Sequence, residues 1–375
     1  MRTVDMTNIS AEERQAICDG FGRLLADKCS EADMRRAMET PDGHDAELWR
    51  AMSQMGIVGL LAPAEHGGVG AGPIEIEAVM EEAGAALLAG PFLSSAVLAT
   101  GMLMNSADTE AKARLLPEIA SGEQIATVAF TDDRGTWDPD SVGVTARPQG
   151  DSWALDGEAS FVTAANIADI LLVVARTPQG LGCFQVSPAT AGVKIKPLQT
   201  WDRTIRLSRI SFAGAAAVTI TGADEAAIER TLDLARVALA GEQAGAARKI
   251  FDITVDYLKT RIQFGRPIGG FQALKHMAAD LLIEVESATS AARAAAQALH
   301  ADAPDKDVLV NLAAFACADA FSQVAASAIQ MHGGIAFTWE HPAHLYLRRA
   351  RASAQLFGQS DRYRERYLAA QEKLA

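Results

Sequence analysis

The sequence predicts an α+β protein in three parts: an N-terminal helical domain, a small central antiparallel β domain and a C-terminal four-helix bundle. Three observations support this. Apolar residues recur at three-to-four spacing up to about residue 124. Short alternating runs, broken by Gly, Pro, Asp and Asn, follow to Ile220. Long Ala-rich stretches then begin at Asp224. We therefore place the domains at residues 1–124, 125–222 and 223–375.

The N-terminal part is expected to form a series of helices. Their predicted ranges are 11–28, 46–55, 74–88, 93–104 and 109–121. The glycine-rich stretch between Pro63 and Gly72 resembles a phosphate-binding loop in composition. It lacks a preceding strand and the Lys-Ser/Thr ending of such loops, which favours a surface turn.

The middle part contains strand-type runs such as IATVAFTD and DILLVVA, separated by turn residues. Strands do not alternate with crossover helices, so a Rossmann-type parallel sheet is not expected. The last part reads as helices over residues 224–261, 272–300, 305–331, 340–355 and 360–373. The first of these would be about 55 Å long at 1.5 Å per residue. The many alanines permit close helix packing, which favours a bundle.

Composition excludes several classes of protein. The formal net charge is −13 for 375 residues, and an acidic surface argues against nucleic-acid binding. No run of 18 uncharged apolar residues occurs, so no membrane span is expected. The N-terminus has no apolar signal region, and the four cysteines are scattered, so we expect a reduced, cytoplasmic protein. His341 and His344 lack a third metal ligand, and no metal site is expected.

The segment RIQFGRPIGGFQALK, from Arg261 to Lys275, joins the first two C-terminal helices. Its cation, amide side chains, aromatic ring and Gly/Pro turn suit a flat, aromatic ligand that bears phosphate. It resembles the flavin-contacting turn of the acyl-CoA dehydrogenase family. PAEHGG, at 63–68, resembles the family's PEEYGG turn, and QMHGG, at 330–334, resembles its Q-x-x-G-G motif. The resemblance keeps the family's order over nearly the whole chain.

The resemblance implies FAD as cofactor and an acyl-CoA thioester as substrate. Desaturation at Cα–Cβ removes a hydride, which needs the flavin, and a proton, which needs a positioned carboxylate. Phe161 stands where the family has Trp and would pack on the isoalloxazine ring, with Thr163 near its N5 edge. The cofactor-binding residues implied are Phe130, Thr131, Phe161, Thr163, Arg261, Gln263, Phe264, Gln272, Gln330, Gly333, Gly334 and Gln359.

The family also builds each flavin site from two subunits. This implies a homo- or heterotetramer with a similar chain and a protein that accepts the electrons.

Further along, the basic cluster Arg348, Arg349 and Arg351 is expected to pair with carboxylates across the bundle.

The catalytic base departs from the family's pattern. Phe357, in LFGQS, takes the position of the usual Glu, and Ala235 takes the position of the Glu in the isovaleryl branch, while Arg236 is kept. Glu242 follows seven residues after Ala235, about 10 Å further along the same helix face. Actinobacterial relatives that act on steroid side chains resemble this chain in a Glu-Gln pair here, in R-x-Q-F-G-R-P-I-G and in W-E-H-P.

Two hypotheses follow, and the first is the prediction made from the sequence. In the first, Glu242 is the base of an FAD-dependent dehydrogenase for a bulky, branched or steroid-derived acyl-CoA. In the second, Glu242 forms a structural salt bridge, for example with Arg236 or Arg248, and the chain is the base-less partner in an α2β2 dehydrogenase. A non-enzymatic acyl-CoA-binding protein is disfavoured by the intact flavin motifs. The substrate-binding residues expected are Arg236, Ala235, Phe357 and Ser94.

Overall fold

The computed structural model describes residues 9–150 and 152–374, which fall into two compact units. The first unit comprises the chain up to Ile17 together with Asp33–Ile76 and Ala89–Ala235. The second unit comprises Cys18–Ala32, Glu77–Leu88 and the chain from Arg236 onward.

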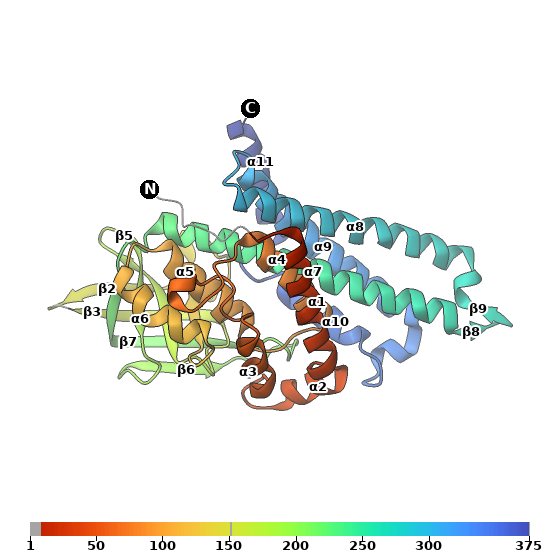
Figure 1. Ribbon diagram of the computed structural model, residues 1–375, viewed down its shortest axis with the longest axis horizontal. Helices are drawn as coiled ribbons and strands as arrows, with labels where there is room; N and C mark the ends of the chain where they lie inside the picture. Colours follow the sequence, from red (N-terminus) through yellow and green to blue (C-terminus); the bar gives the residue numbers. More distant parts are fainter. Residues whose placement is uncertain (1–8, 151, 375) are drawn as a thin grey trace. The chain divides into compact units, whose positions relative to one another are not determined.

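The N-terminal region is helical, as predicted (Figure 1). Asp45 and Asp108 begin two of the helices, since their carboxylates accept hydrogen bonds from backbone N–H groups of the first turn. The predicted helix at 93–104 is a π-helix, Phe92–Ala99, followed by a short α-helix. The helices are α1 (Ala11–Lys28), α2 (Glu31–Glu39), α3 (Ala46–Gln54), α4 (Pro73–Ala85), α5 (Thr100–Asn105) and α6 (Thr109–Ala120).

The central region forms one sheet, which has seven strands in the described part of the chain. Most pairings are antiparallel, as expected, but β1 pairs with β4 in parallel, and β2 and β4 share one parallel bridge. Because β5 pairs with both β4 and β7, the strands β4, β2, β3, β7 and β5 close into a ring. The strands are β1 (Ala126–Ala129), β2 (Val144–Gln149), β3 (Ser152–Thr163), β4 (Ile170–Thr177), β5 (Gly180–Val186), β6 (Val193–Pro197) and β7 (Leu207–Ile220).

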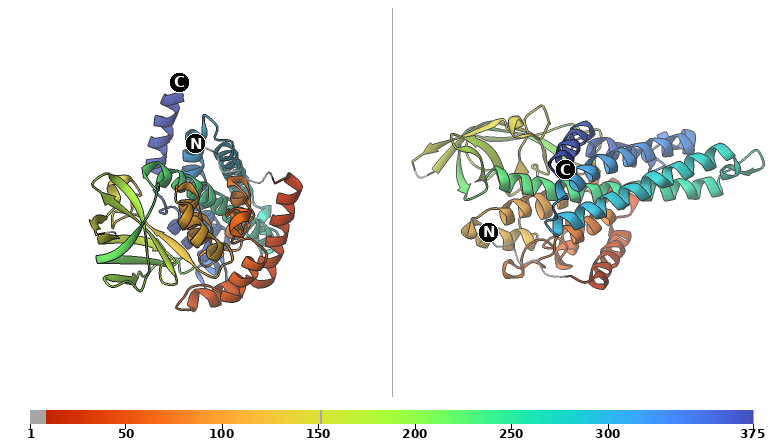
Figure 2. Two further views of the ribbon diagram at one scale, coloured as in Figure 1. Left: turned by 60° about the vertical axis from the view of Figure 1, so that its left-hand side comes forward. Right: turned by 90° about the horizontal axis from the view of Figure 1, so that it is seen from above.

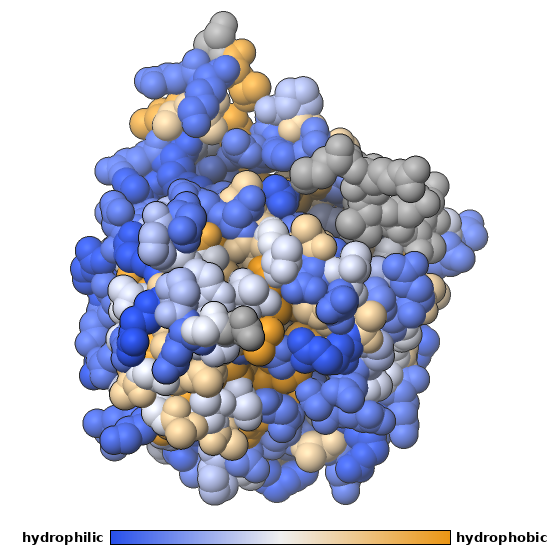
Figure 3. Space-filling model, turned by 90° about the vertical axis from the view of Figure 1, so that its left-hand side faces the viewer, coloured by the Kyte–Doolittle hydropathy of each residue, from blue (hydrophilic) through white to orange (hydrophobic). Residues whose placement is uncertain are grey.

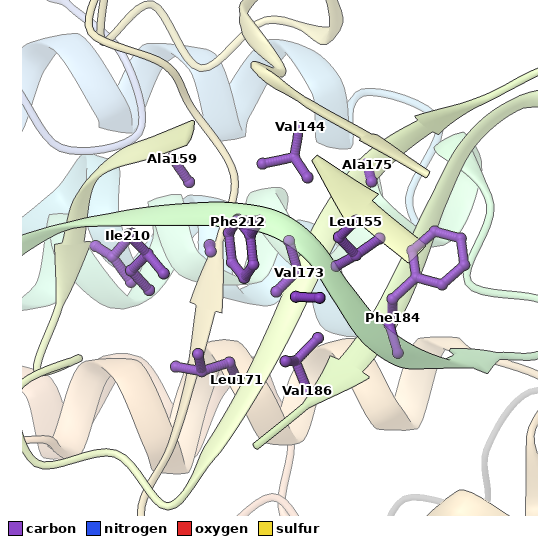
Figure 4. Close-up of a cluster of buried hydrophobic side chains, with 14 of the residues drawn as sticks. Val144, Leu155, Ala159, Leu171, Val173, Ala175, Phe184, Val186, Ile210 and Phe212 are labelled. Carbon is purple, nitrogen blue, oxygen red and sulfur yellow. The ribbon is translucent and has the colours of Figure 1, made fainter. Parts of the chain in front are cut away.

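A core of small and medium apolar side chains holds this sheet together. Leu155, Val173 and Phe184 are buried within it, and Trp153 packs on Phe184 with ring centres 5.1 Å apart. Figure 4 shows these side chains gathered between the strands. Each fully buried side chain of this size contributes about 1.5–3 kcal/mol, so the alternating pattern of the sequence is the main source of stability here.

The second unit is a helical bundle, which confirms the C-terminal helical domain. The helices α7, α8 and α9 run alongside one another, and the hairpin of β8 and β9 joins α7 to α8 (Figures 1 and 2). The elements are α7 (Glu225–Thr260), of which the part from Arg236 onward belongs to this unit, β8 (Ile262–Gln263), β9 (Arg266–Pro267), α8 (Gln272–His300), α9 (Lys306–His332), α10 (Ala343–Ser353) and α11 (Ser360–Leu374).

Three glycines let α4 lie very close to α7. A Cβ atom at Gly84 of α4 would come within 1.9 Å of the carbonyl oxygen of Glu242. Cβ atoms at Gly241 and Gly245 of α7 would come within 2.5 Å and 1.9 Å of carbonyl oxygens on α4. Only glycine fits such an approach between backbones. The small residues of the stretch LAGEQAGAA therefore allow α7 to pack against α4, independently of the role of Glu242.

Among the described residues, one helical stretch, Lys306–Phe337, is long and apolar enough to cross a membrane by those two criteria. About half of its most apolar part is buried, and α9 packs against α8, α10 and α11. Such burial is typical of the central helix of a bundle.

On the face of the molecule shown in Figure 3, hydrophilic residues cover most of the surface, in line with the 22% of residues that are charged.

Candidate active site

In the first unit, the structure brings together the two strand ends expected to contact the flavin. Thr131 follows β1, and its carbonyl oxygen accepts a 2.7 Å hydrogen bond from the N–H of Ser160 on β3. Its hydroxyl donates to Ser141 Oγ at 3.1 Å. Phe130 is buried and stacks on Trp137, with ring centres 5.7 Å apart and planes 8° from parallel. The segment after β1 is thus fixed against the end of β3.

Phe161 occupies an unusual backbone conformation at this point. Between Ala159 and Val162 the register of β3 on β7 shifts, and Phe161 has a φ of +55°. A positive φ is rare for a bulky residue and is maintained only where its surroundings enforce it. The side chain is partly exposed. Thr163, two residues on, is buried, and its carbonyl oxygen accepts a 2.6 Å hydrogen bond from the hydroxyl of Thr127.

In the second unit, the predicted turn residues lie at the end of the bundle. Arg261, Gln263, Phe264 and Gln272 are all exposed at the β8–β9 hairpin and the start of α8. Phe264 is 90% exposed. It meets the ring of Phe271 edge-on at 6.0 Å. These side chains are accessible to a ligand or to another chain.

The QMHGG motif lies where α9 ends. The side chain of Gln330 is exposed, and Cβ atoms placed on Gly333 or Gly334 would meet nothing within 4 Å, so the backbone there is open to a neighbour. His332 is buried between Tyr257 and His341, with ring centres 4.5 Å and 4.3 Å away. Its Nδ1 lies 2.7 Å from a backbone carbonyl of α9. Sequence reasoning did not single out His332, because ring stacking between distant segments leaves no local signal.

The remaining predicted residues are distributed as follows. Gln359 is exposed, and its amide donates to Gln355 at 3.0 Å. Ser94 is buried in the π-helix, and its hydroxyl donates to the Pro91 carbonyl at 3.0 Å. Within the described residues, no group of three His, Cys, Asp or Glu side chains is placed to hold a metal ion.

Neither position of the family's usual base carries a proton acceptor. Phe357 is buried with a φ of +62°, and the hydroxyl of Tyr363 donates to its carbonyl oxygen. Arg236 is also buried, with its guanidinium 5.7 Å from the centre of the Tyr363 ring. Ala235, the other position, is buried as well.

Glu242 forms a buried ion pair, and its partner is Arg349 of α10. The Nη1 group of Arg349 donates to Glu242 Oε1 at 2.8 Å, and the two side chains are only 2% and 8% exposed. Arg349 also donates to the carbonyls of Leu88 at 3.0 Å and Leu87 at 3.4 Å. Arg248, one of the two partners suggested from sequence, pairs instead with Glu286 of α8. The expected pairing of the basic cluster across the bundle is confirmed for Arg349.

The donor set fits a flavin nucleotide. Aromatic side chains and hydroxyl groups gather at one place in the first unit. A cation, amide side chains and open glycine backbone are exposed in the second. Aromatic rings suit the isoalloxazine, and cations and open backbone suit the pyrophosphate and adenosine.

Comparison with known proteins decides the family. The model of the acyl-CoA dehydrogenase N-terminal domain matches residues 11–123, and that of the C-terminal domain matches residues 225–371. The chain belongs to the acyl-CoA dehydrogenase family. It is 38% identical over 346 residues to the acyl-CoA dehydrogenase IpdE2 of Mycobacterium tuberculosis, covering 92% of this chain and 93% of that protein.

Two solved structures resemble this acyl-CoA dehydrogenase over nearly its full length. One is a variant of the Tcur3481-Tcur3483 steroid ACAD, with a TM-score of 0.88 and 28% identity, covering 96% of this chain and 98% of that one. The other is the ChsE4-ChsE5 complex of Mycobacterium tuberculosis, with a TM-score of 0.89 and 28% identity, covering 95% and 96%. The predicted class and cofactor are confirmed: this is an FAD-dependent acyl-CoA dehydrogenase, and FAD supplies the hydride acceptor when bound.

Proposed function

We propose that this acyl-CoA dehydrogenase acts in the α,β-dehydrogenation of a bulky, branched or steroid-derived acyl-CoA, and that a similar partner chain supplies the catalytic carboxylate. The observation that carries the proposal is the ion pair of Glu242 with Arg349. A base must lie beside the substrate and accept its proton. Of the three candidate positions, two hold Phe357 and Ala235, which cannot accept a proton. The third holds Glu242, whose carboxylate is already engaged in an ion pair with the Arg349 guanidinium.

The surroundings of Glu242 support a structural role. Arg349 links α7 to α10 and, through the carbonyls of Leu87 and Leu88, to the segment after α4. The next residue, Gln243, extends the link by donating to Ser353 of α10 at 3.2 Å. A carboxylate held in this way ties three segments of the bundle together.

The relatives support both the assembly and the substrate class. The two solved structures above carry the names of two proteins each, and one is called a steroid ACAD. By analogy we propose a heterotetramer with a similar chain, a bulky acyl group and electron transfer to an acceptor protein, in the cytoplasm. We also retain the domain limits 1–124, 125–222 and 223–375 as a proposal.

In this proposal the residues of the first unit, Phe130, Thr131, Phe161 and Thr163, would orient the isoalloxazine and exclude water from it. The exposed residues of the second unit would bind a phosphate-bearing portion of FAD. These are Arg261, Gln263, Phe264, Gln272, Gln330, Gly333, Gly334 and Gln359. Arg236, Ala235, Phe357 and Ser94 would shape the acyl site. Small side chains such as that of Ala235 leave room for a bulky group.

A second candidate keeps Glu242 as the base of a self-sufficient enzyme. One observation favours it: among the described residues, Oε2 of Glu242 accepts no hydrogen bond, and its side chain retains 8% exposure. Arg349 would then hold one oxygen while the other received the proton.

The deciding experiment is an anaerobic titration of the flavin-loaded chain, purified alone, with octanoyl-, isovaleryl- and cholanoyl-CoA. We expect the visible flavin absorbance to persist with each. We expect bleaching once Phe357→Glu or Ala235→Glu restores a carboxylate at a family position. The two variants guard against one failing to fold. Bleaching of the unmodified chain, abolished by Glu242→Gln with FAD still bound, would establish the second candidate instead.

A further inference from the structure

We propose that Arg209, Asp133 and Ser160 form a clamp that positions the flavin-facing segments of the first unit. The clamp joins the loop after β1, the end of β3 and the start of β7. It rests on the assignment of Thr131 and Phe161 to the flavin and is independent of which chain supplies the base. The three residues are positioning residues, since they act through those neighbours.

The clamp lies at one of the two register shifts between β3 and β7. Ala159 pairs with Ile210 and Val162 pairs with Ser208, so an advance of three residues along β3 matches two along β7. One extra residue is therefore accommodated in β3, which is a β-bulge, and such bulges redirect side chains. Arg209 is the β7 residue opposite the bulge.

Ser160 is the centre of the network. It is buried, its N–H donates to the Thr131 carbonyl at 2.7 Å, and its hydroxyl donates to a carboxylate oxygen of Asp133. Arg209 donates through Nε to the Ser160 hydroxyl at 3.2 Å and through Nη2 to both oxygens of Asp133 at 2.6 Å and 2.7 Å. The hydrogen bond from Ser160, together with Arg209, lowers the pKa of Asp133, so the carboxylate is charged in the neutral range.

This network fixes both sides of the expected flavin contact at once. Next to Ser160, Phe161 is held at a φ of +55°, and its ring lies beside Gly135 of the loop: a Cβ added there would be 3.2 Å from Phe161 Cε2. The loop carries Asp133 and begins at Thr131. Loss of the clamp's side-chain bonds would remove the ties between Asp133 of the loop and the two strands, and the strained Phe161 backbone would then relax more readily by movement of the loop.

The sheet also offers a matched control. Arg147 of β2 pairs with Asp156 of β3 at 3.1 Å. These side chains are 64% and 42% exposed, and those of Arg209 and Asp133 are 36% and 59% exposed, so both pairs are partly open to solvent. That pair lies at the other register shift of β3, between Leu155 and Asp156, away from the bulge at Phe161 and from the expected flavin contacts. Loss of either ion pair removes a similar surface interaction, and only loss of the clamp should alter the flavin.

The test compares Arg209→Ala with Arg147→Ala in the flavin-loaded enzyme as purified. Amide hydrogen exchange in peptides covering 131–137 and 159–163 should rise together in Arg209→Ala. Its FAD Kd should rise roughly fivefold, on the scale expected for loss of a partly exposed ion pair. Its visible flavin band should change shape. Ser160→Ala and Asp133→Asn should act in the same direction, and Arg209→Lys, which keeps the charge, should recover part of the affinity.

Arg147→Ala should change none of these signals. Unchanged exchange in Arg209→Ala would overturn the clamp itself. Faster exchange with unaltered FAD affinity and flavin spectrum would show that the network stabilises the sheet without positioning the cofactor, and would also overturn the inference. Neither result depends on where the catalytic base lies.

Discussion

Replacement of Arg349 by Met should destabilise the bundle far more than replacement of an ordinary surface arginine. The guanidinium is 2% exposed, and its removal leaves the carboxylate of Glu242, 8% exposed, without its partner. Breaking one side of a buried ion pair costs about 3–5 kcal/mol. The carbonyls of Leu87 and Leu88 lose a donor as well.

Arg248→Met is the matched control. It also removes a bond from α7 to another helix, because Arg248 pairs with Glu286 of α8. Those side chains are 34% and 61% exposed, so the loss should be below about 1 kcal/mol. The double variant Arg349→Met with Glu242→Gln removes both charges, and it should be more stable than Arg349→Met alone.

The assay is urea-induced unfolding at neutral pH, followed by far-ultraviolet circular dichroism, with the midpoints compared among the variants. A midpoint for Arg349→Met no lower than that for Arg248→Met would refute the view that the pair stabilises the bundle. Turnover of Glu242→Gln, measured in the complete assembly, separates the two roles. A structural Glu242 predicts less than about a tenfold loss of kcat, whereas a base predicts a loss of about 10²–10⁴-fold.

Two further predictions concern the bundle. Gly84→Ala should lower the unfolding temperature, because the new Cβ would lie 1.9 Å from a carbonyl oxygen of α7. Gly270→Ala, whose nearest neighbour atom would be 3.6 Å away, should not; equal effects would contradict the close approach of α4 to α7. Burial lowers the pKa of both His332 and His341, so their contribution to stability is complete above the unfolded pKa of about 6.5 and is lost as pH falls through the folded pKa. The fall in unfolding temperature between about pH 7.5 and 5.5 should therefore be smaller in His332→Gln, and an unchanged fall would exclude this origin.

The fold followed from periodicity because helical and strand patterns are local. The short helix α2, Glu31–Glu39, was not predicted, since nine residues between turns give too few repeats. The parallel pairing of β1 with β4 was also missed, because strand alternation contains no information about which distant strand is the neighbour. The bulge at Phe161 has no glycine to indicate it.

The candidate site could be predicted only in part, because sequence patterns carry no information about which distant residues meet in the fold. The motif residues could be proposed because this chain matches the family's motifs in their order and spacing; their roles stay predictions. The partner of Glu242 was not found, since Arg349 lies 107 residues away in sequence. The nearer arginines, Arg236 and Arg248, are six positions from Glu242 on the helix, and residues six apart do not share a face.

The most direct test of whether the catalytic carboxylate comes from another subunit is the anaerobic flavin titration of this chain purified alone, repeated after addition of a similar chain isolated with it by affinity purification from its natural host. We expect the flavin of the chain alone to stay oxidised with octanoyl-, isovaleryl- and cholanoyl-CoA. We expect bleaching by at least the bulky acyl-CoA once the partner is present. Bleaching of the chain alone would contradict the claim that its base comes from another subunit.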